Sequence, residues 1–281
     1  MGPSQEQKAR AFQALHERPG CFVIPNAWDA GTASLLTGLG FEAIGTTSAG
    51  LAFSLGRRDG EGRISRDETL ANARAIVAAT HLPVSADLEN GFDRRPEGVA
   101  ETIRLAAGTG LVSGLIEDAT GTPAAPIFDF GLAVERVRAA VEAARSLPFP
   151  FLVTARAENF LYGRPDLDDT IRRLQAFQDA GADVLYAPGL RSREDIATVV
   201  RSIDRPLNVV MGLAGVTLSV PELAAIGVRR VSLGSSLSRA ALGAFLRAAR
   251  EISELGSFTF TKDAVPLAQL NELFRVPPEG R

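Results

Sequence analysis

Short apolar segments recur along the chain, and each is followed by a longer segment with helical periodicity. This alternation predicts a parallel sheet covered by helices, because parallel strands need crossover connections. Continuous apolar strands are typical of strands that are buried on both faces. The expected strands lie at 21–25, 41–47, 82–87, 113–118, 151–156, 183–188, 206–211 and 229–234. The expected helices lie near 28–39, 66–80, 96–109, 131–146, 168–180, 192–203, 219–226 and 235–254.

Eight strand–helix units within about 250 residues indicate an α/β fold, the (β/α)8 TIM-type barrel. A doubly wound open sheet is the alternative, but no G-x-G-x-x-G segment follows the first strand. We expect one barrel domain over residues 1–255, with an N-terminal helix, and a helical extension over 256–281. An apolar stripe in the extension packs on the chain's own barrel or is exchanged with a partner subunit. The stripe consists of Leu267, Leu270, Leu273 and Phe274.

Charge and cysteine content restrict the classes of partner. The 281 residues carry a formal net charge of −3, which argues against nucleic acid or an anionic membrane as a general partner. No run of about 20 apolar residues occurs, so no membrane span is expected. Cys21 is the only cysteine, which excludes a disulfide within one chain and favours a reducing, cytoplasmic compartment. The N-terminal segment lacks the apolar core of a signal peptide.

Acidic residues follow three consecutive expected strands. The segment PVSADLENGFD places Asp87 and Glu89 at the end of one strand, Glu117 ends the next, and Asp59 follows the preceding strand. In TIM-type barrels the carboxyl ends of the strands meet at the functional face. Four carboxylates at one mouth repel one another unless a cation neutralises them. A lone acid at a strand end is more often a helix cap, but this group favours a site for a hard cation such as Mg²⁺.

Other polar residues follow the remaining strands. Arg156 is placed to neutralise an acid or to bind a substrate carboxylate with its fork of donors. Tyr186 and Glu158 also follow strands, whereas Asp118 and Asp29 are expected to be structural or helix-start acids.

No lysine, histidine or cysteine lies at the carboxyl end of an expected strand, which argues against mechanisms that need one of these residues there. The two lysines, Lys8 and Lys262, lie away from strand ends, which argues against a Schiff-base aldolase. His16 and His81 are not placed for metal or base work, and Cys21 begins the first strand, where a core position is expected.

At these residues the chain resembles the isocitrate lyase/phosphoenolpyruvate mutase superfamily, in its phosphoenolpyruvate mutase-like branch. The resemblance covers residues 20 to 255. It rests on the order and spacing of FVIPNAWDAGTASLLTGLGFEAIGTTSAGLAFSLGRRDG, PVSADLENGFD, GLIEDAT, VTARAENFL and AFQDAGADVLYAPG.

The resemblance implies a Mg²⁺ cofactor, with Mn²⁺ as an alternative ion. Asp87 resembles the direct metal ligand, and Glu89, Glu117 and Asp59 resemble acids that bind the ion directly or through water. The segment DLE replaces the more common DAD, which changes the reach of Glu89.

The resemblance also implies a set of residues that act on the substrate. Arg156 resembles the substrate-binding arginine, with Glu158 beside it, and Thr47, Ser48 and Ala49 resemble the pocket for an anionic oxygen. Asp59 and Tyr186 are further candidates for catalysis, and three candidates for the proton donor stay open, namely Tyr186, Glu158 and a metal-bound water.

The expected function is cleavage or decarboxylation of a small 2-oxo or 2-hydroxy dicarboxylate through an enolate, in a homo-oligomer (dimer or tetramer). The KKCGH segment that the resemblance associates with isocitrate and methylisocitrate cleavage is absent, as are the gate Lys and Asn of phosphonate-handling members. The gate here reads DATGTPAAPIFDFG, which suits a lid with little chemistry of its own. Phosphonopyruvate chemistry is one alternative, and a catalytically silent barrel that binds a 2-oxo acid is another.

Overall fold

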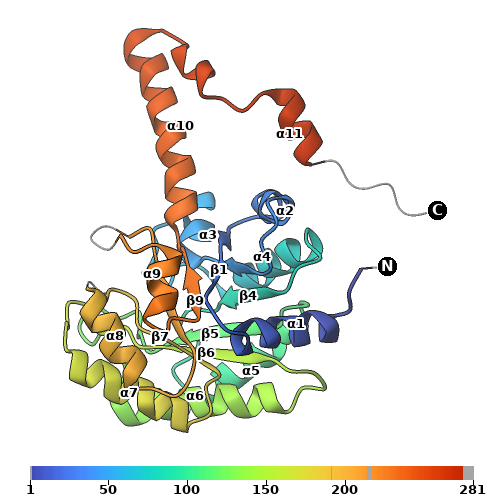
Figure 1. Cartoon of the computed structure of the whole chain (residues 1–281). Helices are drawn as coiled ribbons and strands as arrows, with labels where there is room; N and C mark the ends of the chain where they lie inside the picture. Colours follow the sequence, from blue (N-terminus) through green and yellow to red (C-terminus); the bar gives the residue numbers. More distant parts are fainter. Residues whose placement is uncertain (1, 191, 214–216, 275–281) are drawn as a thin grey trace.

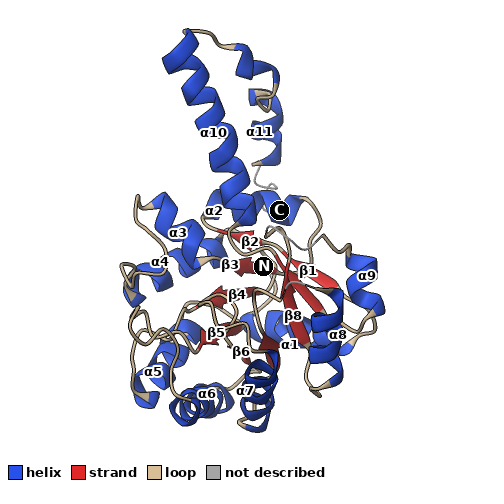
Figure 2. Cartoon of the chain, turned by 90° about the vertical axis from the view of Figure 1, so that its left-hand side faces the viewer, coloured by secondary structure: helices blue, strands red, loops and turns tan. Residues whose placement is uncertain are grey.

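The strands form a parallel sheet that curves into a barrel (Figures 1 and 2). The computed structural model describes residues 2–190, 192–213 and 217–274. The sheet order is β1-β9-β8-β7-β6-β5-β4-β3-β2. The strands are β1 (Phe22–Ile24), β2 (Asn26–Ala27), β3 (Ile44–Thr46), β4 (Val84–Asp87), β5 (Ser113–Glu117), β6 (Leu152–Arg156), β7 (Val184–Tyr186), β8 (Leu207–Val210) and β9 (Arg230–Ser232). The predicted barrel is therefore confirmed.

The first predicted strand is divided at Pro25. Its first half, β1, pairs with β9, and its second half, β2, pairs with β3. Proline has no N–H for a strand ladder, but its carbonyl still accepts a hydrogen bond from Gly45 N at 2.8 Å. Residues 22–27 thus join the two ends of the sheet, which is why nine strands stand where eight were expected.

Helices surround the barrel at nearly all of the predicted places (Figure 2). They are α1 (Gln5–Glu17), α2 (Ala30–Gly38), α3 (Ser48–Ser54), α4 (Arg66–Ala78), α5 (Pro96–Ala107), α6 (Phe130–Arg145), α7 (Leu167–Asp179), α8 (Arg193–Arg201), α9 (Val220–Ala225), α10 (Ser236–Leu255) and α11 (Leu267–Leu273), with a 3-10 turn at Thr259–Lys262. Helix α3 was not predicted. It begins directly after β3, where Thr47 caps it by accepting a hydrogen bond from Gly50 N.

Helix α10 does not pack around the barrel as the pattern predicted. It projects away from the strands, and after it the chain turns back toward the barrel (Figures 1 and 2). All twenty residues of α10 are described, and Ser238 alone among them is buried. Helix α11 contacts α2, with the Phe274 ring beside Gly31. Residues 275–281 of the expected extension lie outside the described ranges.

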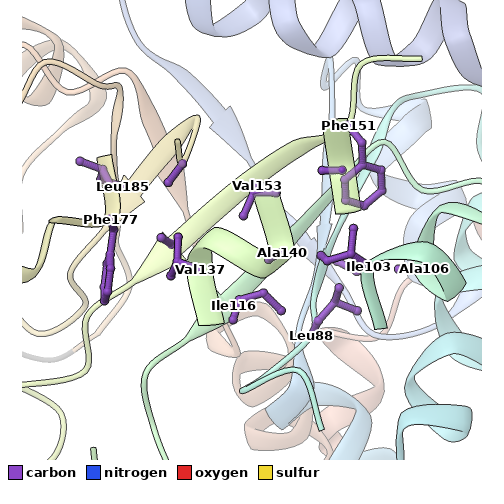
Figure 3. Close-up of a cluster of buried hydrophobic side chains, with 14 of the residues drawn as sticks. Leu88, Ile103, Ala106, Ile116, Val137, Ala140, Phe151, Val153, Phe177 and Leu185 are labelled. Atoms are coloured by element: carbon purple, nitrogen blue, oxygen red, sulfur yellow. The ribbon is translucent and has the colours of Figure 1, made fainter. Parts of the chain in front are cut away.

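The main core fills the layer between the strands and the outer helices. Figure 3 shows Leu88, Ile116 and Val153 from the strand side packed against Ile103 of α5 and Val137 of α6. Full burial of such a side chain is worth about 1.5–3 kcal/mol. This layer fixes where each strand ends, and therefore where the polar residues that follow the strands lie.

A second buried cluster closes the N-terminal end of the barrel. Phe12 and His16 of α1 make edge-to-face ring contacts with Phe22 of β1. His16 Nδ1 lies 2.9 Å from Phe12 O, so this nitrogen donates, and Nε2 accepts from Arg230 Nη1 at 3.4 Å. Burial, assisted by the Arg230 charge, lowers the pKa of His16 to about 3. The imidazole is therefore neutral in the fold.

Acid is expected to destabilise the protein through His16. The unfolded chain protonates this group near pH 6.5, whereas its pKa in the native state is about 3. Between these two values the unfolded state binds more protons than the native state, so the free energy of unfolding decreases as the pH is lowered. Between pH 7 and pH 5 the His16 contribution to the free energy of unfolding falls by about 2 kcal/mol. Urea unfolding at both pH values, with His16→Gln compared with wild type, measures this difference. Equal losses in both proteins would show that His16 is not responsible.

None of the helices within the described ranges is both long and apolar enough to cross a membrane.

Candidate active site

Asp87 is held in one orientation at the end of β4. Its N–H donates to Thr46 Oγ1 at 2.9 Å. One carboxylate oxygen, Oδ2, accepts from Ser48 Oγ at 2.9 Å, and the other, Oδ1, accepts from Glu89 N at 3.1 Å. The hydroxyl of Ser48, which was predicted to lie beside the substrate, donates to the carboxylate of Asp87. Ser48 can reach Asp87 because it begins α3 directly after β3, the strand that pairs with β4.

The predicted acids act on one another electrostatically. Burial raises the pKa of Glu89 to about 8, with further increases from the charges of Asp87 and Asp59. Partial desolvation and the charge of Asp87 also raise the pKa of Asp59, which lies in the exposed loop after α3. The pKa of Glu117 is raised well above its ordinary value by burial, against the opposing effect of Arg156. The four acids therefore share one region, as the strand-end pattern predicted.

Glu89 also has an unusual backbone conformation. Its φ is 49°, in the left-handed region that non-glycine residues rarely adopt. Strain of this kind costs of order 1 kcal/mol and is found most often at functional sites. The carbonyl that follows this torsion, Glu89 O, accepts from Glu117 N at 2.9 Å, which ties the backbones of the two acids together.

The acids do not form a ready-made metal cage. Across the part of the chain that the structure describes, no three acidic, histidine or cysteine side chains are grouped to hold an ion together. The donor set nevertheless fits a hydrated cation, because Asp59, Asp87, Glu89 and Glu117 offer oxygen ligands only, the type that Mg²⁺ prefers. Mg²⁺ typically binds through one or two carboxylates and keeps several waters, so a full cage is not required.

Arg156 lies between two acids at the end of β6. Its Nη1 forms an ion pair with Glu117 Oε2 at 3.2 Å, and its Nε donates to Glu158. The guanidinium carbon is 5.2 Å from the centroid of the Tyr186 ring. Arg156 stands directly opposite Glu117 in the β5–β6 ladder and opposite Tyr186 in the β6–β7 ladder. Of its two predicted roles, the structure shows acid neutralisation.

Glu158 and Tyr186 are both buried beside this guanidinium. Glu158 is 2 % exposed, and burial raises its pKa while Arg156 lowers it. Burial also raises the pKa of Tyr186 to about 12, so this phenol keeps its proton at neutral pH. Both groups adjoin the acids at the mouth of the barrel, where they were expected.

Asp118 is a structural acid, as predicted. Its Oδ1 accepts from Glu158 N at 2.8 Å, and its Oδ2 pairs with Arg173 Nη1 of α7 at 3.1 Å. The network links the ends of β5 and β6 and fixes the backbone at Glu158. Asp29, the other acid predicted to be structural, caps α2 in a reciprocal pair with Thr32.

Loss of Asp118 is expected to destabilise the fold. Asp118→Ala leaves Arg173 with one acid, Asp169, and removes the acceptor for Glu158 N. Breaking a buried ion pair by removing one partner costs about 3–5 kcal/mol. The midpoint of urea unfolding measures the change, with the exposed acid Asp129 replaced by alanine as the control. Equal midpoints for the two variants would contradict a structural role.

A cavity of about 640 Å³ opens beside the acids. Glu89 and Glu117 line it. Tyr162, which the sequence patterns did not single out, also lines it, and burial followed by the charges of Glu117 and Glu158 raises its pKa to about 12. Its position in the loop after β6 was the one available signal. A smaller cavity of about 60 Å³ lies inside the barrel beneath Asp87, Arg156 and Tyr186.

Comparison with known proteins shows where this chain belongs. The family model described as phosphoenolpyruvate phosphomutase matches residues 12–253. The chain belongs to this family. The match agrees with the sequence resemblance, and the family is part of the phosphoenolpyruvate mutase/isocitrate lyase superfamily.

Three relatives in this family illustrate the likeness. A crystal structure from Burkholderia cenocepacia J2315, assigned provisionally as a lyase/mutase, is 60% identical with a TM-score of 0.94, and the match covers 97% of each chain. The uncharacterized protein Rv1998c of Mycobacterium tuberculosis is 34% identical, over 87% of this chain and 89% of its own. The oxaloacetate decarboxylase of Chromohalobacter salexigens is 28% identical, over 91% of this chain and 88% of its own.

Named members of the phosphoenolpyruvate phosphomutase family and its superfamily include 2-methylisocitrate lyases, a 2,3-dimethylmalate lyase and a phosphoenolpyruvate phosphomutase. These names support an enzyme of the lyase or mutase type.

Proposed function

We propose that this protein is a Mg²⁺-dependent carbon–carbon lyase or decarboxylase that acts on a small 2-oxo or 2-hydroxy dicarboxylate through an enolate. The observation that carries the proposal is the contact between Arg156 and Glu117, one member of a group of acids that interact electrostatically at the edge of a cavity. A cation and a guanidinium side by side suit the negative charge that develops when a bond next to a carbonyl breaks.

Four acids would hold the cation. Asp87 is the proposed direct ligand, because neighbouring groups orient both of its oxygens. Glu89, Glu117 and Asp59 would bind the ion directly or through water. When bound, Mg²⁺ or Mn²⁺ supplies Lewis-acid polarisation of a carbonyl and its neighbouring carboxylate.

The remaining candidates would bind the substrate and handle its proton. Arg156 stabilises the developing enolate, and Glu117 and Glu158 hold the guanidinium in place. Thr47 caps α3, and Ser48 and Ala49 begin it. The N–H and hydroxyl of Ser48 both point at Asp87 Oδ2, at 3.4 and 2.9 Å, so an anionic oxygen of the substrate would lie beside this turn and next to Asp87. Tyr186, protonated at neutral pH and beside Arg156, is the proposed proton donor.

Turnover of a substrate panel tests this function. Oxaloacetate, several 2-alkylmalates and methylisocitrate are incubated with the protein in the presence of Mg²⁺ or EDTA, and pyruvate or another 2-oxo acid is detected. The proposal predicts a 2-oxo acid from at least one substrate, with Mg²⁺ only. Oxalate and malate binding without any turnover would instead support a silent binding barrel.

Carbon–phosphorus chemistry is the second candidate, because the matching family model is described as a phosphomutase. The gate segment, 118–131, has neither lysine nor asparagine, which counts against it. Release of phosphate from phosphonopyruvate, or its conversion to phosphoenolpyruvate, would favour this candidate over the lyase.

We also propose that the protein is a homo-oligomer. Helix α10 and the segment after it expose large apolar side chains, including Phe245 at 67%, Leu255 at 74% and Phe258 at 62%. Exposed apolar surface of this kind marks association sites. Light scattering coupled to gel filtration, with Phe245→Ser compared with wild type, would detect the assembly. A monomeric wild-type protein would contradict it.

A further inference from the structure

The large cavity is lined by two arginines, Arg66 and Arg94, as well as by acids. Asp67 and Asp93 also line it. Asp93 forms an ion pair with Arg95, whose Nη2 lies 2.9 Å from Asp93 Oδ2. Among the residues that the structure describes, no carboxylate forms an ion pair with Arg94.

The loop that carries Arg94 is held in place by a buried arginine of α6. Buried Arg136 of α6 donates to the backbone carbonyls of Asn90 and Asp93, which fixes the chain up to the residue before Arg94. The guanidinium carbon of Arg136 is 4.1 Å from the centroid of the Phe128 ring, and that of Arg94 is 5.5 Å from the same centroid. Phe128 is 2 % exposed. A buried ring therefore supports the Arg94 head group at the cavity wall.

We propose that Arg94 binds the second carboxylate of the substrate and so selects dicarboxylates over monocarboxylates. This inference rests on the proposed function, because it assumes that the first carboxylate lies at a cation held by the acids, of which Glu89 and Glu117 line the same cavity as Arg94. A guanidinium binds a carboxylate through two parallel hydrogen bonds, which adds geometric selectivity to charge. The cavity volume of about 640 Å³ accommodates a small dicarboxylate, since small-molecule sites occupy roughly 300–1,000 Å³.

Binding of two matched ligands tests the inference without turnover. Malate and lactate differ by one carboxylate, and their dissociation constants are measured by calorimetry with and without Mg²⁺. Arg94→Gln is expected to weaken malate binding by roughly 10- to 100-fold, the usual range for a hydrogen bond to a charged group. Lactate binding stays unchanged. Arg94→Lys keeps the charge but not the fork and should lose part of the affinity.

Arg95 provides the matched control. It is the next residue on the same loop and is paired with Asp93, and it does not line the cavity. Arg95→Gln should leave the malate-to-lactate preference at the wild-type value. The inference is overturned if Arg94→Gln weakens both ligands equally, or if Arg95→Gln lowers the preference as much. Failure of the proposed metal function has a different signature, because malate binding would then not depend on Mg²⁺ while the Arg94 effect remained.

Discussion

Replacement of Asp87 by alanine is expected to lower Mg²⁺-dependent turnover by about 10³-fold or more. Asp87 is the carboxylate that Ser48 and the backbone N–H of Glu89 orient most completely. Without it, the remaining acids must hold the cation, and raised pKa values for Glu89 and Glu117 favour their protonated forms. The loss should appear in kcat with every substrate that the wild type cleaves.

Two variants separate this effect from general disruption. Asp87→Asn keeps the shape of the side chain and should be nearly as impaired, because the negative charge is lost. Asp129→Asn removes an exposed acid that makes no side-chain cap hydrogen bond at the start of α6, and it should retain wild-type turnover. An Asp87→Ala protein that turned over at the wild-type rate with Mg²⁺ would show that the proposed metal mechanism is wrong.

Replacement of Arg156 by glutamine is expected to have the second-largest effect. Loss of one donor that stabilises developing negative charge costs about 3–4 kcal/mol of barrier, which is a fall of about 10²- to 10³-fold in kcat. The change also leaves Glu117 and Glu158 buried without their cation, and breaking such a pair costs about 3–5 kcal/mol of stability. Activity and stability should therefore fall together.

Arg156→Lys distinguishes the two contributions. The ammonium preserves a positive charge between the acids, so most of the stability should return, as measured by urea unfolding. The planar fork is lost, so kcat should remain low. Recovery of both stability and kcat would mean that Arg156 acts only as a counter-ion for Glu117 and Glu158.

The sequence predicts the barrel well because the alternation of strands and helices arises from local periodicity. Two helices show what such patterns miss. Helix α3 is seven residues long and depends on the cap at Thr47, so it has too little periodic signal to detect. Helix α10 has helical periodicity, but its orientation away from the barrel depends on contacts that periodicity does not encode.

In the site, too, the sequence predicts where residues lie but not the direction in which their side chains point. Strand ends place Asp87, Glu89 and Glu117 together, because parallel strands share one carboxyl edge. Asp59 lies in the loop after α3. Side-chain directions are set by packing. In the gate, Ile127 is 7 % exposed and Phe128 is 2 % exposed, so both point into the protein and do not line the large cavity.

The cavity wall could not be read from the sequence for a related reason. Tyr162 and Arg94 lie in loops, where no periodic pattern indicates which side chains face inward. Their roles depend on neighbours far along the chain, such as Phe128 beside Arg94. Only the folded arrangement brings these residues together.

The central claim, that the acids at the strand ends hold a cation which binds the substrate's carboxylate, is tested most directly by calorimetric titration of oxalate in the presence and absence of Mg²⁺. The account predicts that wild-type protein binds oxalate only with Mg²⁺, and that Asp87→Ala does not bind it under either condition. Equal binding with and without Mg²⁺, or Mg²⁺-dependent binding of wild-type strength by Asp87→Ala, would contradict the account.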